Sequence, residues 1–583
     1  MEDTPKSRPN FSLLWPTDTP KQSASRLPDE VIRNLELEAL VKAMCPYSPH
    51  QDAIRAVLYQ LTPDPAIITY RQAVLSDLLD QPGLAEALKA MLPLLDELVL
   101  FTYQQFAGET SLHEVTWRAG ELQLMLDCIQ RLNEAFAAAA GDINSAGLRT
   151  LQGYIDQITA DETFQQVVDE LPAILAALRE CASITIGVNL DEHLRPEEAV
   201  LLTVNSERFT ASGLLERLLG KKAALEHGIA PIHSLPLVSK SDGMITNLPT
   251  AGPPERMEPM MVPLFRDLSN VLEKATRPIA RELKRYVHLS SQFLANLRPE
   301  IIFYVYAVEL IHKLEALGLP LCPAQVAPLA ERICEVEDSY NIHLALHLSQ
   351  QKPGQTLTGL VVTNDILLGS PGRIVILTGP NQGGKTTYMQ AVGQVQVMAQ
   401  AGLFVPGRQA RVSPVDGIYT HYPVEERLEL GTGRFGDEAR RIRTIFEQVT
   451  RHSLVLLNES LSTTNMGESL YLAQDIVSAM RRIGLRAVYT THLHELAAAV
   501  DELNQKTPGD SELVSMVASY NDAPEADETE ASAESYSYRV VLSPPLGRSY
   551  ADRIAARHGI GLAQLIELLE QRKILGDEAR PDV

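Results

Sequence analysis

The sequence is poor in the features that mark secreted and membrane proteins. Five cysteines are scattered over 583 residues, without the spacing of a metal site or the density of a disulfide-stapled fold. No N-terminal segment combines basic residues, an apolar core and a small-residue cleavage site. The most apolar window, Ile301 to Ile311, is short and carries Glu309. We therefore expect a cytoplasmic chain with reduced core thiols and no membrane span.

Basic residues are also in short supply. The chain has 51 Lys plus Arg against 74 Asp plus Glu, which gives a formal net charge of -23. This balance argues against a surface coated with charge for nucleic acid, although it allows a local basic channel. Part of the acidic excess lies in residues 521–535, which we interpret as a disordered insertion between two strands.

The distribution of apolar residues predicts a multidomain protein with two differently built parts. Residues 1–27 are interpreted as a tail, in which the segment Phe11 to Trp15 has the composition to dock on a neighbour. Residues 28–356 predict an α-helical core, interrupted at about 183–264 by a small strand pair and a proline-rich connection. Residues 357–583 alternate apolar strands with helices, which predicts an α/β sheet covered on both faces.

The strongest local signal is GPNQGGKT, which fits the pattern G-x-x-x-x-G-K-[ST] between an apolar strand and a helix-forming run. In such a P-loop, the backbone N–H groups and the N-terminus of the following helix bind phosphates. Lys385 supplies positive charge, and Thr386 places a hydroxyl on Mg²⁺. The residues expected to bind ATP are Gly379, Pro380, Asn381, Gln382, Gly383, Gly384, Lys385, Thr386 and Thr387.

A second signal follows about seventy residues later in SLVLLNES, an apolar strand that ends in Asn458 and Glu459. We expect Glu459 to act as the general base or to orient the attacking water. Asn458 stands where a nucleotide-hydrolysing enzyme usually has an aspartate, so a metal site there lacks one negative charge. His492, at the end of the next predicted strand, is expected to contact the γ-phosphate region.

A basic helix face precedes this region. It consists of Arg277, Arg281, Lys284 and Arg285 on a helix that Pro278 kinks. The simpler interpretation is a solvated helix face, and the alternative is contact with the phosphates of nucleic acid.

Four segments together resemble the MutS family of DNA mismatch-repair ATPases, members of the ABC superfamily. They are TGPNQGGKTTYMQAVGQ, SLVLLNES, YTTHLHEL and GRSYADRIAARHGI, and the similarity runs from about residue 362 to residue 560. The resemblance implies a P-loop ATPase domain that uses ATP and Mg²⁺, with a C-terminal helical dimerisation segment. It also implies a nucleotide-binding role for Asn381, a place near the base and ribose for Val362 to Leu368, and a switch role for His492.

The family's ATP sites are composite, since a signature segment from the partner subunit completes each one. The matching segment here is LGTGRFGDEARRI, in which Phe435 and Glu438 fit the family pattern. Gly433 and Arg434 replace the usual serine and threonine. We hypothesise that Arg434 substitutes a charge-assisted bond for the usual contact with the γ-phosphate. The loop after the acidic pair, NESLSTTNMGES, also departs from the family's glycine- and threonine-rich pattern.

Upstream, the helices on either side of the strand-containing insert are similar in organisation to the family's lever and clamp core. We expect no mismatch-reading domain before this core and no nuclease-like domain after the ATPase. The leading hypothesis is a homodimeric, ATP-dependent clamp on duplex, mismatched or branched DNA in repair or recombination, with slow ATP hydrolysis. The alternative is an ATP-gated protein-interaction module with little turnover, which the acidic balance and Asn458 favour. A P-loop small-molecule kinase is disfavoured because it needs no long helical arms.

Overall fold

The computed structural model describes residues 11–16, 24–103, 112–139, 143–179, 183–194, 196–205, 283, 291–423, 434–461, 465–520, 536–545 and 559–572. The chain divides into two compact units. The larger unit contains residues 1–92, 135–152 and 297–583, and the smaller unit contains residues 93–134 and 153–296. Contacts therefore group the N-terminal helices with the C-terminal half of the chain. The division into domains at residues 28–356 and 357–583 stays a prediction.

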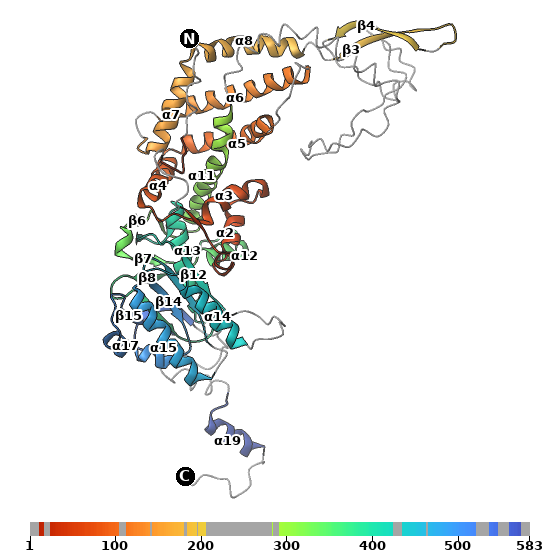
Figure 1. Ribbon diagram of the computed structural model, residues 1–583. Coiled ribbons are helices and arrows are strands. Elements are labelled where there is room, and N and C mark those ends of the chain that lie inside the picture. Colours follow the sequence, from red (N-terminus) through yellow and green to blue (C-terminus); the bar gives the residue numbers. More distant parts are fainter. Residues whose placement is uncertain are drawn as a thin grey trace. The chain divides into compact units, whose positions relative to one another are not determined.

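The larger unit is built around a six-stranded sheet in the order β12-β13-β14-β9-β15-β16 (Figure 1). The neighbours from β12 to β15 pair in parallel, and only β16 is antiparallel to its neighbour. The carboxyl ends of the parallel strands therefore meet at one edge, where ligands bind in open α/β sheets. The strands are β9 (Ile374–Thr378), β12 (Ile418–His421), β13 (Leu454–Asn458), β14 (Arg486–Thr490), β15 (Leu513–Tyr520) and β16 (Tyr536–Leu542).

Helices cover both faces of this sheet, as its continuous apolar strands predict. Val455 and Leu457 of β13 belong to a buried cluster with residues of α14 (Arg434–Phe446) and α15 (Met466–Ile483). Leu456, between them, points to the opposite face, close to Gly393 of α13 (Lys385–Ala401). This alternation is the two-residue period of a β-strand and places α13 across the sheet from α14 and α15.

Helix α13 is buried along most of its length, yet it carries several glutamines. The Gln394 amide donates to Leu35 O at 3.1 Å, and its oxygen accepts from Ile342 N at 3.2 Å. The Gln400 amide donates to Thr62 O and Val415 O, both at 2.9 Å. These side chains satisfy backbone groups that the surrounding segments leave unpaired, so α13 is held by polar contacts as well as by apolar packing.

The N-terminal segment Phe11–Pro16 is part of the larger unit's core, although it falls within the predicted tail. Glu300 accepts hydrogen bonds from Ser12 Oγ and from Leu13 N, both at 2.6 Å. Leu13 O accepts from the Tyr304 hydroxyl at 2.8 Å, and the Leu13 side chain is fully buried. Arg71 of helix α4 (Pro65–Asp80) donates to Leu14 O at 3.0 Å and stacks on the indole of Trp15. The segment that was predicted to dock on a neighbour thus packs against its own chain.

The rest of the larger unit includes further helices, among them most of α11 (Gln292–Ala316), and a second, four-stranded sheet in the order β6-β11-β7-β8. Its strands are β6 (Gln325–Val326), β7 (Cys334–Ser339), β8 (Asn364–Leu368) and β11 (Gln409–Val412). Two short strand pairs also occur, β1 (Ser25–Arg26) with β2 (Gln60–Leu61) and β5 (Leu321–Cys322) with β10 (Val405–Pro406). The helices are α1 (Asp29–Asn34), α2 (Leu37–Met44), α3 (Gln51–Leu58), α4 (Pro65–Asp80), α12 (Ile342–Gln351), α16 (His494–Ala498), α17 (Val500–Lys506) and α19 (Leu562–Gln571).

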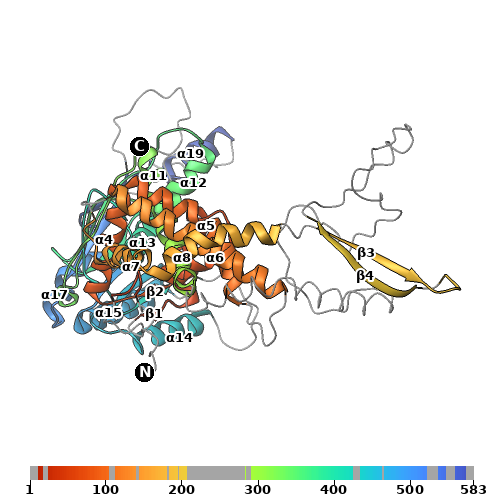
Figure 2. The ribbon, with the colours of Figure 1, turned by 90° about the horizontal axis from the view of Figure 1, so that it is seen from above.

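The smaller unit contains long helices and a hairpin. The helices are α8 (Glu162–Arg179) and parts of α5 (Pro82–Tyr103), α6 (Leu112–Ala138), α7 (Ala146–Thr159) and α11 (Gln292–Ala316). Strands β3 (Ser183–Leu190) and β4 (Pro196–Asn205) form the antiparallel hairpin, which Figure 2 shows as a long two-stranded ribbon. This confirms the strand pair expected inside the helical region.

The four cysteines that the structure describes are free, buried thiols, as predicted. They are Cys45, Cys128, Cys322 and Cys334. Within the described ranges, none of the helices combines the length and apolar character that crossing a membrane requires. The acidic run at 521–535 and the proline-rich connection at 228–264 lie outside the described residues.

Candidate functional site: a glycine-rich loop and an acidic turn at one sheet edge

The glycine-rich loop, residues 379–386, leaves β9 at the carboxyl edge of the sheet and leads into α13. Gly379 has a φ of +143°, and a Cβ atom there would lie 3.0 Å from Ala518 O of the neighbouring strand. Gly384 has a φ of +90° and immediately precedes the helix. Glycine is the residue that adopts such dihedrals without a steric cost, so the loop can turn sharply and lead straight into the helix N-terminus.

Lys385 is the first residue of α13, and its side chain is buried at the centre of the loop. Its ammonium donates to Gly379 O at 2.8 Å and to Pro380 O at 2.9 Å. Its Nζ also lies 3.8 Å from Glu459 Oε1. Burial lowers the pKa of this ammonium, and the Glu459 carboxylate opposes that shift. The site therefore holds a desolvated positive charge, which favours an anionic ligand.

Glu459 follows β13 and lies next to His492, which follows β14. His492 Nε2 donates to Glu459 Oε1 over a distance of 2.9 Å. This hydrogen bond lowers the pKa of the Glu459 carboxyl, against the opposing effect of burial, and the charges of His492 and Lys385 add to the lowering. Glu459 is consequently a carboxylate at neutral pH. Strand β14 lies between β9 and β13, which explains how residues from three strands meet here.

Asn458, the last residue of β13, links the acidic turn to α13. Its Oδ1 accepts a hydrogen bond from Thr386 Oγ1 at 3.1 Å and another from Thr490 Oγ1 at 2.7 Å. Thr386 and Asn458 thus provide neutral oxygen atoms side by side, the ligand type that Mg²⁺ prefers. Among the residues that the structure describes, no group of three His, Cys, Asp or Glu side chains is arranged to hold a metal.

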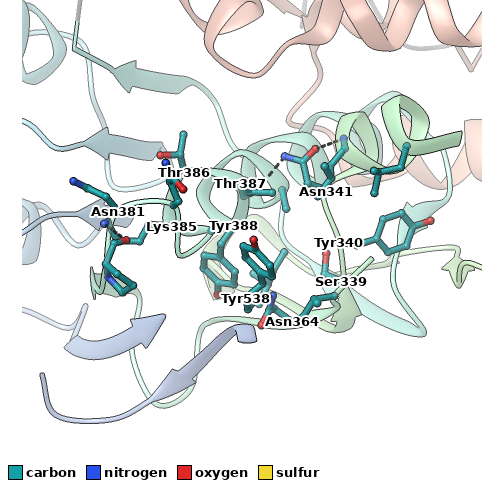
Figure 3. A pocket seen from close by; sticks show the side chains of 18 of the residues that line it. Ser339, Tyr340, Asn341, Asn364, Asn381, Lys385, Thr386, Thr387, Tyr388 and Tyr538 are labelled. Carbon is teal, nitrogen blue, oxygen red and sulfur yellow. Dashed lines mark hydrogen bonds between the residues drawn. The ribbon is translucent and has the colours of Figure 1, made fainter. Parts of the chain in front are cut away.

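A pocket of about 470 Å³ extends from the glycine-rich loop toward α12. Figure 3 shows Asn381, Lys385 and Thr386 at one end, Asn341 and Tyr340 at the other, and two tyrosines between them. We call the end that contains Lys385 the phosphate end and the end that contains Asn341 the apolar end. The phosphate end is lined by Pro380, Asn381, Gln382, Gly384, Lys385, Thr386 and Glu459. The apolar end is lined by Ser339, Tyr340, Asn341, Leu344, Leu348, Leu360, Val362, Asn364, Ile366, Thr387, Tyr388, Ala391 and Tyr538.

Seven of the nine predicted nucleotide residues thus line one pocket, and Gly379 and Gly383 are not among its lining residues. Gly383 donates its N–H to Pro380 O at 3.2 Å inside the loop. Thr387 accepts a hydrogen bond at its carbonyl from the Asn341 amide at 3.1 Å. Val362 and Ile366, within the segment predicted to lie near the base and ribose, line the apolar end.

Other predicted site residues are not brought to this pocket. The basic residues Arg277, Arg281, Lys284 and Arg285 and the signature residue Gly433 lie outside the described residues. Arg434 begins α14, and its side chain is outside what the structure describes. Phe435 is partly buried and packs against the apolar cluster under the sheet. Their proposed contacts with DNA or a partner subunit therefore stay predictions.

Sequence reasoning missed several residues of the site. Thr490 shares the Asn458 oxygen with Thr386, and its position at the end of an apolar strand, two residues before His492, is a signal that would have found it. Asn341 and Tyr538 line the pocket from distant parts of the chain. No local pattern marks either residue, because each joins the pocket only through tertiary packing.

Comparison with known proteins finds similarity over both the helical region and the strand region of the chain. The family model for the MutS2 N-terminal domain matches residues 63–317, and the model for MutS domain V matches residues 375–540. Endonuclease MutS2 of Thermus thermophilus is 35% identical over 189 residues, 32% of this chain and 24% of that protein. DNA mismatch repair protein MutS of Brevibacillus brevis is 35% identical over 145 residues, 24% of this chain and 17% of that protein.

Endonuclease MutS2 of Lactiplantibacillus plantarum is 32% identical over 228 residues, which are 38% of this chain and 26% of that protein. The matches thus span about a quarter or less of the relatives' own length. The two domain models, by contrast, fall on both the helical region and the strand region that contains the glycine-rich loop. The chain belongs to the MutS family.

Proposed function

We propose that this chain is an ATP-dependent DNA-binding protein of MutS type, which acts as a homodimeric clamp on duplex, mismatched or branched DNA and hydrolyses ATP slowly. The observation that carries the ATPase part is the convergence of Lys385, Thr386 and Glu459 at the phosphate end of one pocket. In this proposal residues 379–386 form a P-loop within an ABC-type ATPase domain. The triphosphate lies at the phosphate end, and the base and ribose lie at the apolar end.

The proposed reaction is attack of water on the γ-phosphorus. A bond forms between the water oxygen and phosphorus, the bond from phosphorus to the bridging oxygen breaks, and ADP leaves. Glu459, a carboxylate held by His492, orients the water and accepts its proton. The Lys385 ammonium stabilises the negative charge on the phosphates, and its burial makes that interaction stronger than it would be in water.

Thr386 and Asn458 are the residues that would hold Mg²⁺, Thr386 directly and Asn458 through a bound water. The ion would supply positive charge to the β- and γ-phosphate oxygens. Since Asn458 contributes a dipole and no charge, we propose that this metal site is weaker than one with an aspartate at the same position. Slow hydrolysis follows from that weakness.

The DNA part of the proposal rests on the family and on the basic face at Arg277, Arg281, Lys284 and Arg285. Each contact between a basic side chain and a phosphate releases counterions, so binding through this face falls steeply with salt. The partner-subunit contact is assigned to Gly433, Arg434 and Phe435. If Arg434 bonds the γ-phosphate of the partner subunit's nucleotide, Arg434→Ala lowers the ATPase rate of the dimer.

The decisive experiment measures binding of homoduplex, mismatched and junction DNA, with and without ATP, across a salt series. The proposal predicts that affinity falls with salt, and that DNA changes the ATPase rate or the affinity for nucleotide. An affinity for DNA that does not change with salt concentration, or no binding to any of the three DNAs, would contradict the proposal.

A second candidate is an ATP-gated protein-interaction module with little turnover and no direct reading of DNA. The net charge of -23 and the amide at Asn458 favour it. In that case DNA leaves both the ATPase rate and the affinity for nucleotide unchanged, so the same measurements separate the two candidates.

A further inference from the structure

The turn that carries Glu459 has an unusual backbone. Glu459 has a φ of +48° and Leu461 a φ of +67°, both in the left-handed region that non-glycine residues adopt at a steric cost. A glycine at either position would adopt the same conformation freely. Such strained residues persist only where the surroundings hold them, and they cluster at functional sites.

Ser460, between these two residues, is held from both neighbouring strands. Its hydroxyl lies 2.7 Å from Nδ1 of His421, the last residue of β12. Its carbonyl accepts a hydrogen bond from the Tyr489 hydroxyl of β14 at 2.8 Å. Because β13 lies between β12 and β14, the two bonds reach the turn from opposite sides. Ser460, His421 and Tyr489 are all buried, so no water competes for these contacts.

The backbone on either side of Ser460 is tied in the same way. Glu459 N donates to Thr490 O at 2.9 Å, and Leu461 N donates to Glu438 Oε1 at 2.6 Å. The His421 contact differs from the other bonds because it is made by the side chain of Ser460. It adds an anchor from β12, whereas the Tyr489 and Thr490 bonds come from β14 and the Glu438 bond comes from α14.

His421 is neutral near pH 7. Burial lowers the pKa of His421 to about 4, and the nearby charge of Arg441 contributes in the same direction. The contact is thus a hydrogen bond between two neutral groups, and it persists unchanged near neutral pH. His492, by comparison, is partly exposed and touches Glu459 itself.

We propose that His421 and Ser460 are positioning residues for Glu459, a role that rests on the proposed function of Glu459 in hydrolysis. The pair holds the left-handed turn so that the Glu459 carboxylate meets His492 and faces Lys385. Loss of the pair lets the turn relax and moves the carboxylate. A displacement of about 1 Å at a reacting group lowers rates by as much as about 100-fold, whereas the phosphate-binding loop is untouched.

The test compares kcat for Mg²⁺-ATP hydrolysis with the Kd for ATP in the full chain. Ser460→Ala and His421→Phe each remove the hydrogen bond, and we expect kcat to fall roughly tenfold while the Kd stays within about twofold. His421→Asn places an amide group near the position of Nδ1 and is expected to restore most of the lost rate. Tyr489→Phe keeps the aromatic ring and deletes the hydrogen bond to Ser460 O. If Ser460→Ala does not fold, the same kcat and Kd are measured in Tyr489→Phe.

A matched control is Ser413→Ala, which deletes a buried serine bond to Pro328 O away from the pocket lining. It is expected to lower Tm and leave kcat unchanged. The proposal is overturned if Ser460→Ala and Tyr489→Phe keep the wild-type kcat, or if kcat, Kd and Tm change in them only as they do in Ser413→Ala. Glu459→Gln, measured in parallel, separates this outcome from failure of the proposed function. Full activity of Glu459→Gln would refute the role of Glu459 itself.

Discussion

The two ends of the pocket differ in charge, since charged side chains line the phosphate end and neutral amides line the apolar end. At the phosphate end, the Lys385 ammonium and the Glu459 carboxylate lie 3.8 Å apart and face the same space. At the apolar end, the side-chain amides of Asn341 and Asn364 are neutral and are hydrogen-bonded within the protein. Asn341 caps α12 through Leu344 N at 2.9 Å and donates to Thr387 O at 3.1 Å.

Asn364 behaves in the same way at the apolar end. Its amide donates to Tyr538 O at 3.0 Å, and its oxygen accepts from Val540 N at 2.7 Å. For a ligand this leaves mainly the aliphatic surface of Leu344, Leu348 and Leu360, together with the Ser339 and Tyr340 hydroxyls, which have no hydrogen-bond partner among the described residues. The difference indicates that charge at one end governs which group binds and reacts. Contact area at the other end adds affinity with little chemistry of its own.

The largest effect is expected from Lys385→Met, which keeps the volume of the side chain and removes its charge. Because the ammonium is buried and desolvated, its loss is expected to weaken ATP binding about 100-fold, the range of charged hydrogen bonds in a dry site. Titration with a fluorescent ATP analogue measures this, with the exposed Lys506→Met as the control for lost charge. Equal ATP affinity in Lys385→Met and wild type would show that the triphosphate does not bind at the phosphate end.

A smaller effect is expected from Asn458→Asp. The carboxylate can accept the hydrogen bonds of Thr386 and Thr490 as the amide does, and it adds a negative charge beside the proposed metal. We expect Mg²⁺ to bind roughly tenfold more tightly during ATP hydrolysis, with a higher rate at low Mg²⁺. Measurement of the ATPase rate against Mg²⁺ concentration tests this, with the exposed Gln325→Glu as the control for added charge. No change in either quantity would show that Asn458 has another role.

The smallest effect is expected at the apolar end. Leu344→Ala removes part of a side chain that is 37% exposed, so the lost contact area is modest. We expect ATP affinity to fall about threefold with kcat unchanged. Steady-state kinetics with Mg²⁺-ATP separates the two parameters. A fall in kcat at constant affinity would show that the two ends are not independent.

The phosphate end was predictable because its chemistry is local in the sequence. The loop from Gly379 to Thr386 is one continuous motif, and Glu459 and His492 each follow an apolar strand. In a parallel sheet, residues at the ends of strands meet at one edge, whatever the order of the strands. The prediction did not give the order itself, in which β14 separates β13 from β9.

Apart from Val362 and Ile366, the lining of the apolar end was not predictable, and neither was the support of the turn that carries Glu459. Both depend on contacts between distant segments. His421 and Ser460 are 39 residues apart, and although Ser460 ends the segment SLVLLNES, nothing in that segment indicates a partner at His421. The glutamines of α13 have the polarity of a solvated helix face, yet Gln394 and Gln400 are buried against backbone groups elsewhere in the unit. Composition and periodicity report average environments, and buried polar pairs are exceptions to that average.

The most direct test of the account measures Mg²⁺-dependent ATP hydrolysis and ATP affinity together in wild type and in Glu459→Gln. Glutamine keeps the shape of the side chain and can still accept the hydrogen bond of His492, but it cannot take a proton from water. The account predicts slow hydrolysis in the wild type, a fall in kcat of about 100-fold or more in the variant, and ATP affinity within about twofold. Hydrolysis at the wild-type rate by Glu459→Gln would contradict it.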